Sequence, residues 1–135
     1  MIAVQELLTI YVELQETHTL KSPEGQINMV LFGGRCESEH FTGQVLSGGV
    51  DTQTYLTGQP GRLSARYMLR GTAADGSPAT LFIENNGVFD ENGVCHTRPT
   101  LYTDNDSLRW LCQTPMTGSI SGWEKGVIIH LCKEN

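Results

Sequence analysis

The chain has 135 residues and a formal net charge of −6, from 9 Lys and Arg against 15 Asp and Glu. This length predicts one domain over residues 1–135, and no window approaches the roughly 20 consecutive apolar residues that a membrane-spanning helix needs. With 39% hydrophobic and 18% charged residues the chain is not disordered, and its acidic balance argues against a nucleic-acid partner.

The first strands follow from alternating hydropathy. Every second residue is apolar over Glu6–Gln15, which predicts a half-buried strand. A turn is predicted over Thr17–Gly25, because Ser22-Pro23-Glu24-Gly25 combines a fixed φ at Pro with a residue free to take positive φ. The next strand covers Gln26–Gly33, and Gly33-Gly34 is expected to end it.

The middle of the chain contains the clearest hairpin. A polar strand over Arg35–Leu46, a break at Ser47-Gly48-Gly49 and a short strand over Asp51–Leu56 lead into it. Leu63–Arg70 and Ala79–Asn86 both alternate, and Asp75-Gly76 between them is a strong hairpin-turn signal. We expect these two strands to pair antiparallel.

The last third of the chain completes an all-β pattern. Gly87–Asp106 is expected to be irregular, and strands are predicted over Leu108–Thr114, Gly118–Trp123 and Gly126–Lys133, the last apolar on both faces. No window predicts a helix. Eight to ten short strands predict a single antiparallel closed β-barrel, because closure removes exposed strand edges. The 15 glycines suit its many turns.

The N-terminal sequence and the spacing of the cysteines predict a cytoplasmic protein with reduced cysteines. No basic or long apolar stretch precedes Glu13, so we expect no secretory signal and a cytoplasmic location. The cysteines are far apart and are expected to be small reduced apolar residues. Cys95-His96 and the pair His130 and Cys132 lack a second half at zinc spacing, so we expect no metal or other cofactor.

Two polar residues fall on apolar strand faces. Asn85 is in phase with Leu81 and Ile83, and Tyr67 is in phase with Leu63 and Leu69. A buried polar group without a partner costs about 1–3 kcal/mol, so each needs one. Either the two satisfy each other or nearby backbone, or they line a pocket in the barrel lumen.

Other polar side chains have open interpretations. Asp51 and Gln53 share one face of their strand and either orient a ligand at the barrel mouth or cap a turn. Arg66 lies opposite the apolar face and is a solvated side chain, an ion-pair partner of Glu84, or an anion clamp. His40 and His130 are acid–base candidates or satisfied structural residues.

Four segments in fixed order carry a family resemblance. Gly43–Gln53 resembles G-x-V-L-P-G-G-x-D-W-Q, and Leu63–Leu69 resembles L-D-A-R-Y-x-L. Asp75-Gly76 with Ile83–Gly87 resembles D-G-x-x-I-x-V-x-N-x-G, and Thr97–Leu111 contains a T-x-P-x-F-x-T…W-L-like pattern. Together they resemble the uncharacterised DUF3237 family, over about residues 5–133.

The resemblance implies a small antiparallel β-barrel similar in shape to allene oxide cyclase and dirigent proteins, with no established reaction. It implies a pocket whose matching polar positions are Asp51, Gln53, Arg66, Tyr67 and Asn85. Ser47 replaces the usual Pro and Thr52 the usual Trp, which would thin the pocket wall. The stretch between Gly87 and Thr97 is short, so a lid or short helix is expected to be missing there.

Three functions follow as hypotheses. The first is binding of a small hydrophobic or carboxylate-bearing ligand in the lumen. The second is an isomerase, cyclase or lyase, in which Tyr67 or Asp51 moves a proton and Arg66 or Asn85 holds an oxyanion. The third is a structural homo-dimer or higher homo-oligomer that buries the two-sided apolar strand Val127–Leu131.

Overall fold

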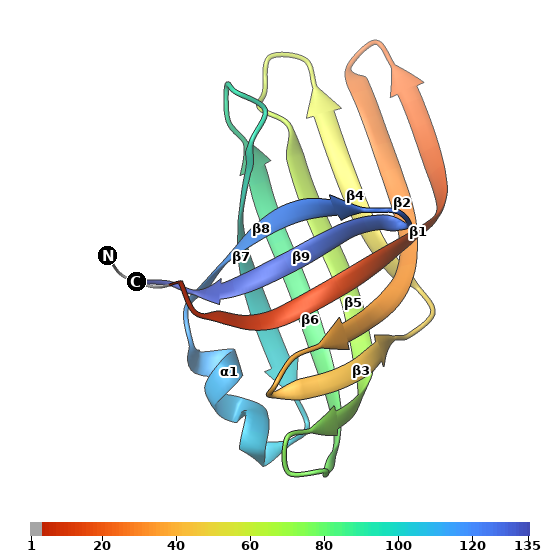
Figure 1. The fold of residues 1–135 in the computed structure, drawn as a ribbon. Coiled ribbons are helices and arrows are strands. Elements are labelled where there is room, and N and C mark those ends of the chain that lie inside the picture. The colour runs from red at the N-terminus through yellow and green to blue at the C-terminus, as the bar shows by residue number, and fades with distance from the viewer. Residues whose placement is uncertain (1–3) are drawn as a thin grey trace.

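A computed structural model describes residues 4–135 and shows a nine-stranded antiparallel sheet with one short helical segment (Figure 1). No helix in this part of the chain has the length and apolar character to span a membrane. The elements in chain order are β1 Glu6–Ser22, β2 Gly25–Glu37, β3 Phe41–Val45, β4 Gly49–Leu56, β5 Arg62–Ala73, β6 Pro78–Phe89, β7 Cys95–Thr103, the 3₁₀ turn η1 Asp106–Leu108, α1 Arg109–Gln113, β8 Met116–Trp123 and β9 Gly126–Lys133.

The strand pairings form a ring. The order runs from β1 through β9, β8, β7 and β6 to β5. From β5 it continues through β3 and β4, both of which pair with β2, and β2 returns to β1. The junctions are unequal, because β7 and β8 are joined at one register pair, Thr97 opposite Gly118. The all-β antiparallel prediction is confirmed.

The predicted hairpin is present, with the predicted faces. β5 pairs antiparallel with β6 across the Asp75-Gly76 turn, and Leu63, Ala65, Tyr67 and Leu69 all face the core. β9 also confirms its predicted strand, with Ile129 buried and Ile128 half-buried on the opposite face. Self-association through that outer face stays a prediction.

Several sequence-based boundaries near the N-terminus are wrong. β1 continues through Thr17–Ser22, paired with β2, and the chain reverses only at Pro23-Glu24. These β1 side chains are polar or exposed on both faces, so no hydrophobic alternation marks the strand. A register shift between Leu14 and Thr17 is a bulge, which bends β1 and re-aims its faces.

Gly33-Gly34 lies inside β2 and does not end it. Gly34 has φ +132°, and a Cβ there would lie 1.9 Å from the Tyr11 carbonyl oxygen. Glycine therefore permits the close approach of β1 and β2. The polar strand predicted over Arg35–Leu46 is instead the end of β2, a turn at residues 38–40, and β3.

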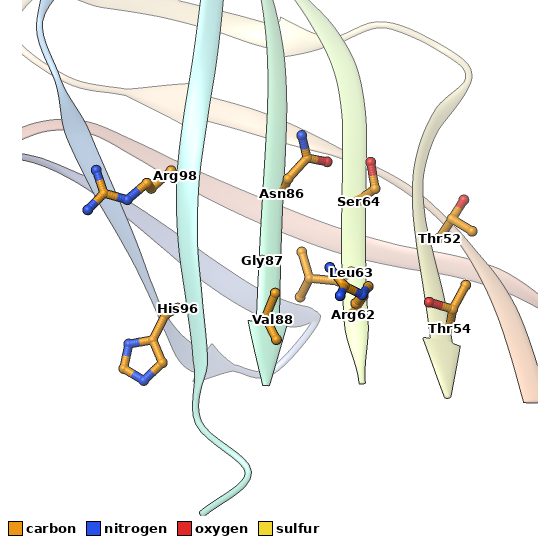
Figure 2. Close-up of a pocket in the computed structure, with 10 residues that line it drawn as sticks. All are labelled: Thr52, Thr54, Arg62, Leu63, Ser64, Asn86, Gly87, Val88, His96 and Arg98. Atoms are coloured by element: carbon orange, nitrogen blue, oxygen red, sulfur yellow. The ribbon is translucent and has the colours of Figure 1, made fainter. Parts of the chain in front are cut away.

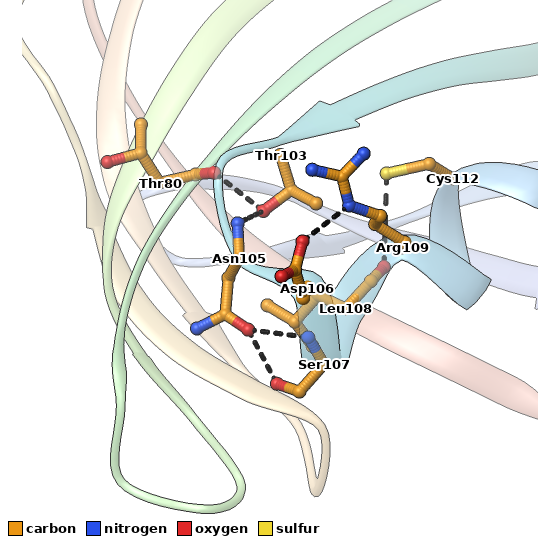
Figure 3. A network of polar contacts seen from close by, with 8 residues as sticks. All are labelled: Thr80, Thr103, Asn105, Asp106, Ser107, Leu108, Arg109 and Cys112. Carbon is orange, nitrogen blue, oxygen red and sulfur yellow. Dashed lines mark hydrogen bonds and ion pairs between the residues drawn. The ribbon is translucent and has the colours of Figure 1, made fainter.

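The region around α1 was also mispredicted. Gly87–Asp106 contains the end of β6 and all of β7, and Leu108–Thr114 is largely helical rather than a strand. Asn105 explains the helical turn: its side-chain oxygen accepts from the Ser107 amide at 2.9 Å, which caps η1 (Figure 3). Its side-chain nitrogen donates to Ser77 Oγ at 2.8 Å, so the cap is tied to the β5–β6 turn.

The arrangement of the hairpins positions the candidate site. The tips of β1–β2, β4–β5 and β6–β7 project together at one end, beyond the crossing strands β8 and β9, whereas α1 lies at the other end (Figure 1). On β1, the ladder with β9 covers Glu6–Glu13 and stops before the bulge. The three hairpin tips therefore lie beyond the end of the β1–β9 ladder.

Candidate interior binding site

A cavity of about 410 Å³ lies inside the ring, and eight of the strands contribute to its lining. Its walls are mainly apolar, with a few polar groups from β1, β2, β4, β6 and β7. The lining residues are Val12, Leu14, Thr17, Asn28, Val30, Phe32, Asp51, Gln53, Leu63, Ala65, Asn85, Phe89, Cys95, Ile120, Val127 and Ile129.

Strand register places the two predicted polar groups on one row of the sheet. Asp51 on β4 is opposite Ala65 on β5, and Ala65 is opposite Asn85 on β6. With strands about 4.8 Å apart, the Cα atoms of Asp51 and Asn85 are roughly 10 Å apart. The methyl side chain of Ala65 between them leaves open space.

A chain of hydrogen bonds ends on Asp51. Thr19 Oγ1 donates to Asn28 Oδ1 at 2.9 Å, and Asn28 Nδ2 donates to Gln53 Oε1 at 3.3 Å. Gln53 Nε2 then donates to Asp51 Oδ2 at 3.1 Å. The predicted shared face of Asp51 and Gln53 is therefore confirmed, and their side chains are in direct contact.

Some acceptors in this interior have no partner among the described residues. Asp51 Oδ1 and Asn85 Oδ1 are both buried without a hydrogen bond, as is Thr97 Oγ1. Each such atom costs about 1–3 kcal/mol. Burial raises the pKa of Asp51 above its ordinary value, and the hydrogen bond from Gln53 opposes that effect. Two residues that line the cavity, Asp51 and Asn85, therefore each have one oxygen without a hydrogen bond from the described residues.

Tyr67 is buried, as its phase predicts, but it is not among the residues that line the cavity. Its ring meets Phe32 edge-on at a centroid distance of 5.2 Å. Its hydroxyl has no partner, so the expectation that Tyr67 and Asn85 satisfy each other is wrong. Burial raises the pKa of the phenol far above its ordinary value, which keeps it neutral.

Arg66 lies on the outer face of β5. Its Nε donates to Glu84 Oε1 at 2.8 Å, and 65% of its side chain is exposed. The ion-pair interpretation is therefore confirmed, and the interpretation of Arg66 as an anion clamp in the lumen is wrong. No Lys, Arg or His from residues 4–135 lines the cavity.

Thr52 also faces outward, in a shallow hollow of about 510 Å³ on β4–β7 (Figure 2). The expectation that Thr52 thins the wall of the interior pocket is wrong, because Asp51 and Gln53 occupy the inward face of β4. The hollow contains Arg98 and His96, but Arg98 pairs with Glu134 at 3.1 Å and His96 with Asp90 at 2.8 Å. Arg62 also lines the hollow, and none of the ion pairs found in residues 4–135 includes it, so the charges of the hollow are only partly matched.

The other sequence candidates lie away from the cavity. His40 packs edge-on against Trp110 at a centroid distance of 4.8 Å, and His130 contacts Ser121 Oγ at 2.8 Å and the Glu6 carboxylate. All four cysteines are free. Residues 4–135 contain no cluster of three or more His, Cys, Asp or Glu side chains placed to hold a metal.

The sequence interpretation did not identify Asn28, Phe89 or Cys95 as lining residues. Asn28 is two positions from Val30 and four from Phe32, so its phase with these apolar residues was the available signal. Cys95 begins β7, in a stretch that was expected to be irregular. Burial raises the pKa of its thiol, which therefore stays protonated.

Comparison with known proteins agrees with the fold and with the sequence segments noted above. The model of a protein family of unknown function, DUF3237, matches residues 2–93. The chain belongs to the DUF3237 family. A curated relative, a UPF0311 protein of Clostridium acetobutylicum, is 40% identical over 58 residues. The matched segment is 43% of this chain and 34% of that relative, so it spans about a third of the relative's length.

Solved structures similar to this chain support its fold alone, because their sequence identities with it are below 25%. A protein of unknown function from Clostridium acetobutylicum has a TM-score of 0.81 at 24% identity, with 99% of this chain and 100% of that chain covered. A protein described as β-barrel-like from Acinetobacter baumannii has a TM-score of 0.74 at 20% identity, with 97% and 94% covered. This DUF3237 chain thus has a β-barrel-like fold.

Proposed function

We propose that this DUF3237 protein binds a small, largely apolar molecule in the interior cavity, with Asp51 and Asn85 receiving its polar groups. The observation that carries this proposal is the pair of buried, unpartnered acceptors on one sheet row, separated by Ala65. The cavity volume of about 410 Å³ falls within the range of roughly 300–1,000 Å³ found for small-molecule sites.

The closed-barrel interpretation belongs to the same proposal. The ring of pairings around β8 and β9 forms the enclosed part, and the ligand enters between the three hairpin tips, beyond the end of the β1–β9 ladder. Of the two ligand types expected from the sequence, the hydrophobic one is favoured. A ligand carboxylate would meet the Asp51 carboxylate and no cation.

Filling the cavity tests the proposal. Ala65→Leu adds a bulky side chain between Asp51 and Asn85, and we expect it to weaken binding of the neutral fluorescent probe N-phenyl-1-naphthylamine at least tenfold. Ser64→Leu places a bulky side chain on the outer face of the same strand and is the matched control, with binding unchanged. Equal probe affinity in a folded Ala65→Leu variant would contradict interior binding.

An isomerase, cyclase or lyase is the second candidate, favoured by the buried carboxyl of Asp51. A carboxyl whose pKa is raised by burial can take a proton from one ligand atom and return it to another. Asn85 would then polarise a ligand carbonyl. The sequence-based roles of Arg66 in holding an oxyanion and of Tyr67 in moving a proton drop out, because neither residue lines the cavity. This candidate requires product formation that Asp51→Asn abolishes while ligand binding persists, and binding without product in the wild type argues for the binder.

A further inference from the structure

We propose that the cavity selects organic cations: its ligand is an amphipathic amine whose ammonium group binds the Asp51 carboxylate and whose apolar body fills the rest of the space. This inference rests on the proposed function and names the ligand class for the same site. It reverses the carboxylate-bearing ligand expected from the sequence.

The charge of the lining is the first argument. Asp51 is the one carboxylate among the lining residues, and no basic side chain accompanies it there. None of the ion pairs found in residues 4–135 includes Asp51. A buried charge is strongly unfavourable unless it is paired. A ligand cation would supply the partner that the protein lacks.

The hydrogen-bond chain is the second argument, because its amides are oriented toward negative charge. Gln53 directs its amide nitrogen at Asp51 Oδ2, and Gln53 is held by Asn28. Asn28 Oδ1 in turn accepts from Thr19 and from Gln26 Nε2, the latter at 3.0 Å. Donors aligned in this way favour the ionised carboxylate. Rotation about its terminal torsion exchanges the two carboxylate oxygens, so either can face the ligand.

The aromatic lining is the third argument. Phe32 and Phe89 both line the cavity, and the Tyr55 ring packs on Phe89 at a centroid distance of 6.0 Å. The faces of aromatic rings attract ammonium groups and also pack against apolar groups. The net charge of −6 further favours approach of a cation over approach of an anion.

A series of matched ligands separates charge from shape. We would titrate the full chain by calorimetry with 1-naphthylmethylamine, 1-naphthylmethanol and 1-naphthoate at pH 7.5 and low salt. The amine should bind at least tenfold more tightly than the alcohol, and the carboxylate should bind most weakly. Equal binding of alcohol and amine would overturn cation selection and leave the proposed function intact, whereas no binding by any of the three would overturn both.

Two variants test whether the preference for the amine depends on the Asp51 carboxylate. Asp51→Asn keeps the shape and removes the charge, so the tenfold preference for the amine should disappear while the affinity for the alcohol changes less than threefold. Glu84→Gln makes the same change in net charge on the outer face and should keep the preference. Retention of the preference in Asp51→Asn would overturn the assignment. The wild-type series is decisive by itself if that variant fails to fold.

Discussion

Asp51 shows how a single buried carboxylate can oppose folding. Its carboxylate is held inside the ring by one hydrogen bond from Gln53, while its second oxygen has no partner. Burial raises its pKa relative to the unfolded chain, so the folded state holds the proton more tightly. The resulting stability is complete below the unfolded pKa of about 3.9 and is lost as the pH rises through the higher folded value.

Asp51→Asn should therefore stabilise the unliganded protein at pH 7 by on the order of 1 kcal/mol, because no charge is left to bury. The difference should vanish near pH 3, where the carboxyl is protonated in both states. Urea unfolding at the two pH values measures this. Asp75→Asn is a control of opposite sign, since hydrogen bonds from Ser77 lower the pKa of Asp75, so its loss should destabilise the protein at pH 7. Lower stability of Asp51→Asn at pH 7 would contradict the prediction.

The alternation of apolar residues predicts which side chains face the interior of some strands. It predicts the polar residues of the candidate site less well. Asn85 was placed correctly because Leu81 and Ile83 mark the buried face of β6. On β4 both faces are polar, so phase pairs Asp51 with Gln53 but does not say whether they or Thr52 face the interior. Arg66 was assigned to the pocket through the family resemblance, whereas its own phase already placed it opposite the apolar face.

At the scale of elements, the segment around α1 shows what alternation misses. Leu108 and Leu111 are both buried and three residues apart, which is helical spacing, but a strand was predicted over so short a window. Asn105 before Asp106-Ser107 was the available N-cap signal. β1 beyond its bulge was missed for a different reason, because main-chain pairing with β2 rather than apolar side chains defines it.

Asn105→Ala should destabilise the protein by about 1–2 kcal/mol, because it removes the cap of η1 and the link to Ser77 together. Urea unfolding measures the loss. Asn92→Ala, on the exposed β6–β7 loop, should stay within about 0.5 kcal/mol of the wild type. A loss no larger for Asn105 than for Asn92 would mean that the network in Figure 3 does not hold the helical segment in place.

For the whole molecule, the number of paired residues differs between the strand junctions of the ring. This difference predicts that the amides of different strands are unequally protected from hydrogen exchange. β5 and β6 pair along nearly their whole lengths, whereas β7 and β8 share one register pair. Local opening should start at the weak junction, so amides of β8 should exchange with deuterium at a lower opening free energy than those at the centre of β5. Mass spectrometry of exchanged peptides measures the difference, and equal protection of both strands would count against a weak junction.

The ring also has a consequence for how fast the molecule folds. The β1–β9 ladder pairs Ile10 with Ile129, so closure joins residues that are nearly the whole chain apart. Neighbouring hairpins such as β5–β6 and β8–β9 need only short loops and can form early. Closure by β1 and β9 carries a much larger loop entropy and is expected to be a late, slow step. Until it happens, the apolar wall of the future cavity is open to solvent and to other chains.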